Sequence, residues 1–417
     1  MSTSTPMQTV SVIGLGYIGL PTAAVLAQAG KTVIGVDVKQ ANVDAINAGR
    51  VPFVEEGLET VVAGTVAQGK LSAQTETPEA DAYIVSVPTP FKGDHEADLS
   101  YIEAAARGIA PKLKGGELVV LESTSPPGAT EHMAAVILKE RTDLTDEPGR
   151  ANSLYFSHAP ERVLPGRIMI EMVENDRIIG GTTAEASEMT RELYASFCNG
   201  ELLVTDAKTA EMAKLTENAF RDVNIAFANE LSIIAERQGI DVWELIELAN
   251  HHPRVNILQP GPGVGGHCIA VDPWFIVSAD REFSKLIATA RNVNDSKPEI
   301  VIEKVLERAA RFKAPTVAAL GIAFKPNIDD LRESPSRNIA GALAERLEGG
   351  TVLVVEPNVD ELPKELAERD NVELVSLEDG IERADIVLLL VDHDPFKLID
   401  RDLLHEKIVV DTKGLWR

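Results

Sequence analysis

A glycine-rich loop that ends in a cysteine is the stretch of the sequence with the clearest chemical potential. The loop spans residues 259–268 and holds four glycines and two prolines before Cys268. Such a backbone can wrap closely around a ligand. If a helical turn begins at Cys268, Asp272 lies on the same face, and the helix N-terminus favours the thiolate that attacks carbonyl carbons. A lone cysteine is more often a small buried apolar residue, so both interpretations of Cys268 stay open, whereas we assign Cys198 to the buried class.

A second set of polar residues lies on a predicted long helix. Residues 207–238 have helical spacing, and Lys214 and Asn218 are four residues apart within them, so they share a face. Such polar residues could belong to a site, although charged residues on helices usually just face solvent. Glu161, which follows a predicted strand, is a weaker hint of chemistry.

The residues from 12 to 19 predict a site for a dinucleotide. Gly14, Gly16 and Gly19 follow an apolar strand and open a helix, where they permit a tight turn, the approach of a pyrophosphate and close helix packing. Asp37 ends the next strand, where a carboxylate accepts hydrogen bonds from ribose hydroxyls and repels a 2′-phosphate. This favours NAD over NADP, although Lys39 weakens the discrimination. The predicted cofactor contacts are Gly14, Gly16, Tyr17, Ile18, Gly19, Asp37 and, from two later strand-end loops, Thr89 and Thr124.

These candidate residues need a scaffold of alternating strands and helices. Short β-branched runs alternate with amphipathic stretches in both halves of the chain, which is typical of buried parallel strands. We expect an α/β fold with two Rossmann-like doubly wound domains joined by a helical middle domain with a long central helix, and domains of residues 1–195, 196–312 and 313–417. The expected strands are 10–13, 32–36, 82–87, 118–122, 154–158, 177–180, 316–320, 351–355, 385–391 and 407–411.

Composition argues against several classes of protein. The formal net charge of −25 disfavours unspecific binding to nucleic acid or to an anionic membrane surface. No apolar run is long enough to span a bilayer, and residues 1–6 lack the features of a secretory signal. Two cysteines cannot build a disulfide framework, which fits a reducing cytoplasm. Although His267 adjoins Cys268, no paired Cys or His spacing indicates a metal site.

Three blocks of the sequence resemble the diagnostic motifs of the nucleotide-sugar 6-dehydrogenase family, the group of UDP-glucose and GDP-mannose dehydrogenases. They are residues 210–221 (AEMAKLTENAFR), residues 263–268 (GVGGHC) with Asp272, and residues 321–335 (GIAFKP through RESP). The blocks occur in order, and the resemblance covers nearly the whole chain. It implies an NAD-dependent enzyme whose first domain binds NAD and whose last domain binds a nucleotide sugar.

The resemblance implies a role for each residue that matches a motif. Cys268 is the implied nucleophile, while Lys214, Asn218 and Asp272 orient and stabilise the oxygen at the reacting carbon. The other implied roles are water positioning by Thr124 and Glu161, substrate contact by Lys325, and cofactor contact by Arg332. Further candidates for substrate binding are Arg162, Gly265 and Arg254, the last because arginine binds phosphate bidentately.

Within the family, residues 160–166 (PERVLPG) and 266–274 (GHCIAVDPW) are most similar to enzymes that act on UDP-N-acetyl-D-mannosamine. Many family members instead continue the Pro-Glu pair as Pro-Glu-Phe-Leu, and this departure indicates a change in sugar recognition. UDP-glucose or another UDP-N-acetylhexosamine is an alternative substrate. The implied reaction is a four-electron oxidation of the C6 alcohol to a carboxylate, through a thiohemiacetal and then a thioester on Cys268.

Two other functions compete with this interpretation. A one-step hydroxyacid dehydrogenase would also join a Rossmann domain to a helical domain, but it would form one NADH and would not need Cys268. A non-catalytic NAD sensor would bind NAD without turnover, and it would give no reason for the glycine-rich loop. The expected partner is a second copy of the chain, bound through the middle helices.

Overall fold

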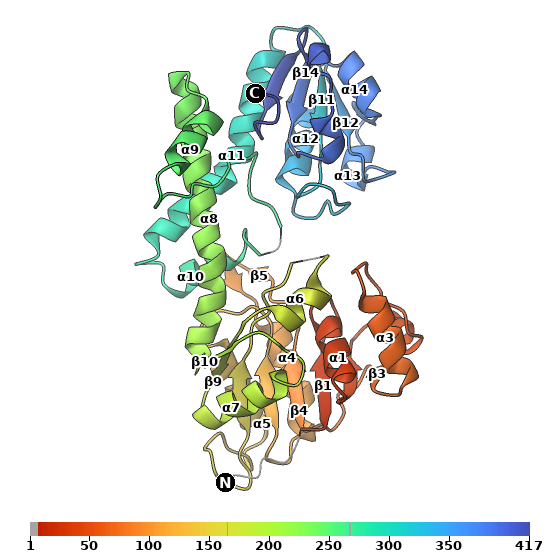
Figure 1. The fold of residues 1–417 in the computed structure, drawn as a ribbon, viewed down its shortest axis with the longest axis vertical. Coiled ribbons are helices and arrows are strands. Elements are labelled where there is room, and N and C mark those ends of the chain that lie inside the picture. Colours follow the sequence, from red (N-terminus) through yellow and green to blue (C-terminus); the bar gives the residue numbers. More distant parts are fainter. Residues whose placement is uncertain (1–6, 165, 267) are drawn as a thin grey trace. The chain divides into compact units, whose positions relative to one another are not determined.

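The computed structural model describes residues 7–164, 166–266 and 268–417 of the chain (Figure 1). Residues 1–6, in which we expect no signal sequence, and Pro165 and His267 lie outside the described residues. Internal packing divides the chain into two units, Met1–Glu217 and Asn218–Arg417. The division falls inside one long helix, and the domain limits at 195 and 312 stay predictions.

Unit 1 is built on one sheet of eight strands in the order β10-β9-β8-β7-β4-β1-β2-β3. Of the seven pairs of neighbouring strands, six are parallel, and β8 and β9 are antiparallel. The strands are β1 (Thr9–Ile13), β2 (Thr32–Val36), β3 (Leu71–Gln74), β4 (Ala82–Val85), β7 (Leu118–Leu121), β8 (Tyr155–His158), β9 (Arg177–Gly181) and β10 (Leu202–Asp206), with a small separate hairpin of β5 (Phe91–Lys92) and β6 (Glu96–Ala97).

Helices cover both faces of this sheet, because successive strand residues point to opposite sides. Leu118 and Val120 of β7 pack in one apolar cluster, and Val119 and Leu121 pack in the other. The first cluster is completed by α1 (Gly19–Gln28), α2 (Gln40–Asn47), α3 (Leu58–Ala67), α6 (Ile168–Glu174) and α7 (Ala184–Tyr194). The second is completed by α4 (Ser100–Ile109), the short 3₁₀ helix η1 (Ala110–Lys112) and α5 (Ala129–Glu140).

The direction of β9 corrects the expectation that all strands of this sheet are parallel. β9 runs antiparallel to β8, with Ser157 opposite Gly181 and His158 opposite Gly180. Open α/β sheets commonly carry such a reversal near one edge. An apolar run is equally compatible with either direction, so the sequence pattern of residues 177–180 could not decide the pairing.

The expected long helix is α8 (Ala207–Gln238), which has 32 residues and extends about 48 Å at 1.5 Å per residue (green in Figure 1). In unit 2 it is followed by α9 (Val242–Asn250), α10 (Asp272–Ala279) and α11 (Lys285–Ala309). A small core of Ala228, Ala235, Val242 and Ile246 joins α8 to α9. The prediction of a helical middle region is thus confirmed.

A second sheet completes unit 2, with five parallel strands in the order β13-β12-β11-β14-β15. The strands are β11 (Thr316–Leu320), β12 (Thr351–Val355), β13 (Val372–Leu374), β14 (Ile386–Leu389) and β15 (Ile408–Asp411). One face packs on α11, α12 (Pro335–Arg346) and α13 (Lys364–Ala367), and the other on α14 (Leu377–Arg383), α15 (Asp394–Lys397) and the 3₁₀ helix η2 (Arg401–Leu404). The fold class expected from the sequence is confirmed.

Candidate active site

The turn between β1 and α1 has room for a ligand at only one of its three glycines. The amide of Gly14 donates to the Val36 carbonyl over 2.8 Å. A Cβ on Gly14 would lie 2.3 Å from the Ser86 carbonyl oxygen, and one on Gly19 would lie 1.8 Å from the Gly14 oxygen. A Cβ on Gly16 would meet nothing within 4 Å. Gly14 and Gly19 therefore serve the turn itself, whereas Gly16 borders open space.

The start of α1 and Asp37 fit the expected dinucleotide. Ile18 precedes the helix, and no side chain caps its first turn. Backbone amides at such a helix start bind phosphate. Asp37 is half-buried, and its carboxylate accepts from the amides of Leu15 (3.2 Å) and Lys39 (2.8 Å). These bonds fix the carboxylate at the strand end, where ribose hydroxyls are expected.

The two later strand-end loops are bonded to one another. Thr89 Oγ1 donates to the Thr124 carbonyl oxygen over 2.7 Å, so two predicted cofactor contacts lie together. Ser123 strengthens the junction, because its Oγ accepts from the Val87 amide over 2.8 Å. Tyr17, a further predicted contact, is partly exposed and stacks on Phe53 with ring centroids 4.3 Å apart.

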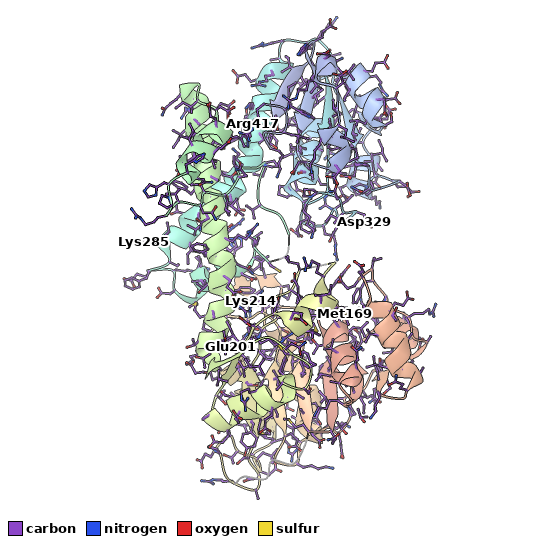
Figure 2. All side chains as sticks on the ribbon, viewed as in Figure 1. Met169, Glu201, Lys214, Lys285, Asp329 and Arg417 are labelled. Carbon is purple, nitrogen blue, oxygen red and sulfur yellow. The ribbon has the colours of Figure 1, made fainter. Side chains whose placement is uncertain are left out.

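Glu211 ties the start of α8 to the loop that carries Thr124. The Glu211 side chain is fully buried and accepts from the Thr130 amide (2.8 Å), the Thr130 hydroxyl (2.6 Å) and the Gly128 amide (2.6 Å). Burial raises the pKa of this carboxyl to about 7, against the lowering effect of the Thr130 and Gly128 donors. The residue caps α5 from another helix and thereby fixes Lys214, one turn further along α8 (Figure 2), relative to the loop.

His158 lies near Lys214 at the end of β8. The imidazole is fully buried, and burial lowers its pKa to about 3, with a further lowering by the charge of Lys214. A neutral imidazole beside the lysine leaves the ammonium charge of Lys214 undiminished. Lys214 itself is half-buried, as a group that meets both protein and ligand must be.

Glu161 and Arg162 are both engaged by other parts of unit 1. The Glu161 side chain is 6% exposed, forms an ion pair with Arg177 on β9, and accepts from the Arg162 amide over 2.7 Å. The Arg162 guanidinium pairs with Glu217 of α8 over 2.6 Å and donates to the Asp176 carbonyl. Both candidate residues are thus held in defined orientations.

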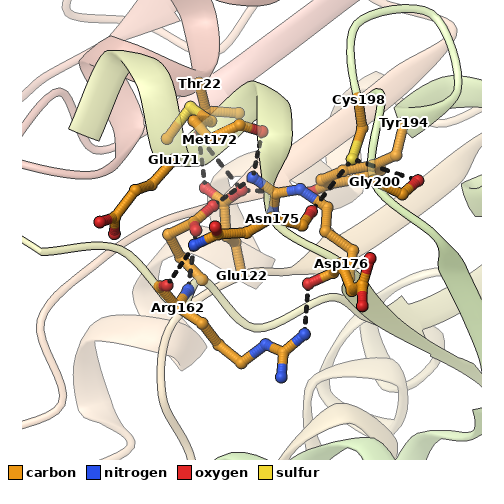
Figure 3. Close-up of polar contacts among 12 residues, drawn as sticks. Thr22, Glu122, Arg162, Glu171, Met172, Asn175, Asp176, Tyr194, Cys198 and Gly200 are labelled. Carbon is orange, nitrogen blue, oxygen red and sulfur yellow. Dashed lines mark hydrogen bonds and ion pairs between the residues drawn. The ribbon is translucent and has the colours of Figure 1, made fainter. Parts of the chain in front are cut away.

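In unit 2, Cys268 lies one turn before α10, with an exposed side chain. The Cys268 carbonyl accepts from the Val271 amide (3.1 Å) and the Asp272 amide (2.8 Å), so a helical turn begins there as expected. The Asp272 side chain is buried, and its Oδ2 accepts from Asn218 Nδ2 over 2.5 Å. Three predicted site residues therefore lie together. Cys198, by contrast, is buried, with Sγ 3.4 Å from the Asn175 carbonyl oxygen (Figure 3), which confirms its assignment.

The glycine-rich loop before Cys268 packs against the segment of the third sequence block. A Cβ on Gly265 would lie 2.5 Å from the Glu333 carbonyl oxygen and 2.6 Å from Pro335 Cδ. A Cβ on Gly263 would lie 2.9 Å from Pro335 Cβ. The Gly266 amide donates to the Glu333 carbonyl over 3.1 Å. The glycines are therefore needed because the loop touches backbone and proline, and Gly265 has a packing role within this unit.

A buried polar ladder between α8 and α11 supports the other end of the loop. Asn229 Oδ1 accepts from the Gly261 amide over 2.9 Å, and Asn229 Nδ2 donates to Asn294 Oδ1 over 2.9 Å. Asn294 Nδ2 and Arg291 Nη1 both donate to Asp222 Oδ1, over 2.8 and 2.5 Å. The ladder anchors Gly261 to the helix that carries Asn218.

Lys325 lies in a loop that a buried glutamate and histidine fix in place. Glu356, after β12, accepts from the amides of Ile322 (2.8 Å) and Ala323 (3.1 Å) and lies 3.1 Å from His393 Nε2. Burial raises the pKa of Glu356, but the His393 and Ile322 hydrogen bonds outweigh it, so the pKa lies below its usual value.

His393 and Asn327 close this clamp from the other side. The Asn327 amide donates to His393 Nδ1 over 2.9 Å, so the ring proton lies on Nε2, facing Glu356. Asn327 has a positive φ of 60°, and its Oδ1 accepts from the Asp394 amide over 3.0 Å. The clamp joins the carboxyl ends of three strands to the segment that carries Lys325.

Arg332 and Arg254, the two other arginines predicted to bind ligands, lie on the surface of unit 2. Arg332 is exposed and forms a two-point ion pair with Asp330 over 2.7 and 2.9 Å. Arg254 is exposed after α9, and its amide donates to His252 Nδ1 over 3.3 Å. Their roles toward cofactor and substrate stay predictions.

Three family models match successive parts of the chain. They describe the NAD binding domain, the central domain and the UDP binding domain of one family, and match residues 8–198, 208–296 and 318–417. The chain belongs to the UDP-glucose/GDP-mannose dehydrogenase family. It is an NAD-dependent nucleotide-sugar dehydrogenase, as the sequence analysis predicted, and NAD is its cofactor.

Two full-length relatives of this dehydrogenase have different names. It is 57% identical to an NDP-N-acetyl-D-galactosaminuronic acid dehydrogenase of Ralstonia nicotianae, over 98% of this chain and 96% of the relative. It is 56% identical to a UDP-N-acetyl-D-mannosamine dehydrogenase of Escherichia coli, over 98% and 99%. Among solved structures, the UDP-D-ManNAc dehydrogenase of Pyrococcus horikoshii is 37% identical, with a TM-score of 0.86 over 98% of this chain and 96% of that one.

The dehydrogenase contains supporting residues that the sequence analysis did not single out for function. They are Glu122, Arg177, Glu211, Asp222, Arg291, Glu356 and His393. All are buried charged or titratable groups, and burial is not visible in a sequence. One signal was available for Glu211, which lies within the first diagnostic block. In the described part of the chain, none of the helices has the length and apolar character that a membrane crossing requires.

Proposed function

We propose that this dehydrogenase oxidises C6 of UDP-N-acetyl-D-mannosamine to the uronate in two steps through a covalent adduct on Cys268. The observation that carries the proposal is the exposed side chain of Cys268, one turn before α10, in the same segment as the Asn218–Asp272 hydrogen bond. The full-length similarity to UDP-N-acetyl-D-mannosamine dehydrogenases supports the sugar. The Ralstonia relative makes UDP-N-acetyl-D-galactosamine the second candidate substrate.

In the first step, the C6 hydroxyl loses its proton to water or to Asp272 while a hydride leaves C6. Bound NAD supplies the acceptor for each of the two hydrides. The Cys268 thiolate then adds to the aldehyde carbon, and a C–S bond forms as the carbonyl oxygen gains negative charge. Covalent capture keeps the reactive aldehyde from escaping.

Lys214 and Asn218 stabilise the oxygen of the adduct. The ammonium group and the amide can each donate to an oxyanion, and one such donor contributes roughly 3 to 4 kcal/mol to catalysis in comparable sites. The two residues are four positions apart on α8, so they share one face of a rigid helix. Asp272 keeps the Asn218 amide turned so that its nitrogen donates, because Asp272 accepts from Nδ2.

In the second step, the adduct loses a hydride from C6 and becomes a thioester. Water then attacks the thioester carbon, the C–S bond breaks, and Cys268 regains its thiol as the acid leaves. Glu161 is the proposed residue that positions and deprotonates this water, and Thr124 is a second candidate for positioning it. The remaining cofactor and substrate roles follow the sequence analysis, with Lys325, Arg254 and Arg162 on the substrate and Arg332 on the cofactor.

A substrate panel tests the proposal. The purified enzyme is incubated with NAD and, separately, with UDP-N-acetyl-D-mannosamine, UDP-N-acetyl-D-galactosamine, UDP-N-acetyl-D-glucosamine, UDP-glucose and GDP-mannose, while NADH absorbance is followed. We expect the highest kcat/KM for UDP-N-acetyl-D-mannosamine and two NADH per sugar consumed. One NADH per sugar would support a one-step dehydrogenase instead.

We also propose that the enzyme is a homodimer and acts in the cytoplasm. Phe220, Phe227 and Ile234 of α8 are 71%, 51% and 45% exposed and follow one another at intervals of seven, so they form one apolar stripe. A second copy of the chain would cover this stripe. Phe227→Glu should convert a dimer to a monomer in sedimentation, and a monomeric wild type would contradict the idea. A reducing compartment suits a thiol catalyst.

A further inference from the structure

A buried guanidinium lies between two carboxyl groups in unit 1. Arg177 of β9 is 3% exposed and forms an ion pair with Glu161. Glu122, which directly follows β7, is 2% exposed and lies in the same cluster (Figure 3). Three ionisable groups therefore share one region without solvent.

Arg177 forms its ion pair with one carboxylate, that of Glu161. Its Nη2 reaches Glu161 and, over 3.3 Å, the Met172 carbonyl oxygen. Its guanidinium lies 5.0 Å from the ring centroid of Tyr194 and 5.4 Å from that of Phe197, so aromatic rings pack against it. Nε and Nη1 are buried and have no hydrogen-bond partner in the described chain. Among the described residues, Glu161 is the ion-pair partner of Arg177.

The hydrogen-bond partners of the Glu122 carboxyl group among the described residues are hydroxyl groups. Thr22 Oγ1, from α1, lies 3.0 and 3.1 Å from the two carboxyl oxygens, and the Tyr194 hydroxyl donates to Oε1 over 3.1 Å. Burial, followed by the negative charge of Glu161, raises the pKa of Glu122 to about 7, against the lowering effects of Arg177, Thr22 and Tyr194.

The charges of the cluster balance only when one carboxyl carries a proton. One guanidinium and two carboxylates would leave a net negative charge in a region without water, which is costly. Glu161 accepts from the Arg177 guanidinium and from the Arg162 amide, whereas no ion pair is formed by Glu122 among the described residues. The proton therefore belongs on Glu122, whose hydroxyl neighbours accept as well as donate.

We propose that Arg177 is the positioning residue for Glu161 in thioester hydrolysis, and that Glu122, as a neutral acid, leaves the whole charge of Arg177 to Glu161. This inference rests on the role of Glu161 given under the proposed function. Arg177 fixes the orientation of the Glu161 carboxylate, so that Glu161 can take a proton from the attacking water. Arg177 itself touches neither substrate nor cofactor in this account.

The groups that surround the two carboxyls are few. Around Glu122 they are the hydroxyls of Thr22 from α1 and Tyr194 from α7, and the charged groups of Arg177 and Glu161. Around Glu161 they are Arg177 and the neighbouring Arg162, whose guanidinium is paired with Glu217. Removal of Arg177 thus leaves the buried Glu161 carboxylate without its cation.

The test is rapid-quench kinetics of Arg177→Met with NAD and UDP-N-acetyl-D-mannosamine. We expect a burst of two NADH per active site at the wild-type rate, an acyl-enzyme that accumulates and is seen by intact-protein mass spectrometry, and a kcat reduced by about 100-fold or more at unchanged kcat/KM, because KM falls with kcat when only hydrolysis is slowed. The hydrolysis rate of the variant should rise with pH, whereas a purely structural role would leave the pH profile unmoved. Arg191→Met is the matched control, because Arg191 lies on the surface of α7 and pairs with Glu188.

A double variant separates the proposed role of Arg177 from a loss of folding. Arg177→Met leaves a buried carboxylate unpaired, whereas Arg177→Met with Glu161→Gln removes both charges. The double variant should hydrolyse the acyl-enzyme at the rate of Glu161→Gln alone, because the two residues act as one unit. Wild-type hydrolysis by either Arg177 variant, or loss of the first NADH along with the second, would overturn the proposal. A wild-type enzyme that forms no acyl-enzyme would instead refute the proposed function.

Discussion

Asn218 Nδ2 donates to Asp272 Oδ2 over 2.5 Å, and this bond ties the long helix α8 to the first residue of α10. The Asp272 amide in turn donates to the Cys268 carbonyl, so the backbone of Cys268 is held next to Asp272. The Asn218 amide nitrogen has a second N–H, which can donate to the oxygen of a bound substrate. Cys268, Asn218 and Asp272 thus bring a nucleophile, a hydrogen-bond donor and a proton acceptor together.

Asn218→Leu should lower kcat by about 100- to 1,000-fold, because it removes an oxyanion donor and a partner of the buried Asp272. Steady-state NADH formation measures the effect. Asn224→Ala is the matched control on the same helix, because the Asn224 amide only bonds back to the Phe220 carbonyl over 2.7 Å. Equal rates in the two variants would exclude a catalytic role for Asn218.

Gly16→Ala and Gly19→Ala should separate ligand binding from folding. A methyl at Gly16 meets no protein atom within 4 Å, so the melting temperature should stay that of the wild type while NAD binding weakens tenfold or more. A methyl at Gly19 would lie 1.8 Å from the Gly14 oxygen, so that variant should lose stability first. Calorimetry of NAD binding and thermal melting check both. Undiminished affinity in Gly16→Ala would contradict the pyrophosphate site.

The sequence predicted regular elements well where their own residues determine them. Strands β2, β11 and β12 and helix α8 begin and end at the expected residues, because their apolar periodicity is uninterrupted. Strands β3, β10 and β13 were missed. They have three to five residues, and many of these residues are exposed. Their structure depends on pairing with a neighbouring strand rather than on their own sequence pattern.

Glu122→Gln should remove a pH dependence of stability. Because burial raises the pKa of Glu122 from 4.5 to about 7, the folded form keeps a proton that the unfolded form releases, so stability decreases as pH rises from about 4.5 to 7. The loss is about 3 kcal/mol at pH 8, at 1.36 kcal/mol per pKa unit. The melting temperature of Glu122→Gln should therefore exceed that of the wild type by more at pH 8 than at pH 5. A constant difference between the two proteins at both pH values would refute this assignment.

His393→Ala should release the loop that carries Lys325. The change removes the acceptor of the Asn327 amide and a donor to the buried Glu356. An unsatisfied buried group costs about 1 to 3 kcal/mol, so KM for the UDP-sugar should rise about tenfold or more while kcat changes little. His405→Ala, at an exposed histidine after η2, is the control. A KM equal to that of the control would show that the clamp does not serve substrate binding.

The candidate site was only partly accessible from the sequence. Helical spacing predicted that Cys268 and Asp272 share one face, whereas Asn218 was joined to them only by the family resemblance, and its bond to Asp272 was not predicted. Glu122 and Arg177 belong to no such pattern, since they are distant in sequence and meet only because strand ends converge at one edge of the sheet. Their ionisation depends on burial, which the fold creates.

Product stoichiometry is the most direct test of the covalent role of Cys268, on which the proposed mechanism depends. NADH and uronic acid are quantified after complete turnover of a limiting amount of UDP-N-acetyl-D-mannosamine by the wild type and by Cys268→Ser, with NAD affinity measured for both. The account predicts two NADH per acid for the wild type, and no acid but unchanged NAD affinity for the variant. Full acid production by Cys268→Ser would contradict it.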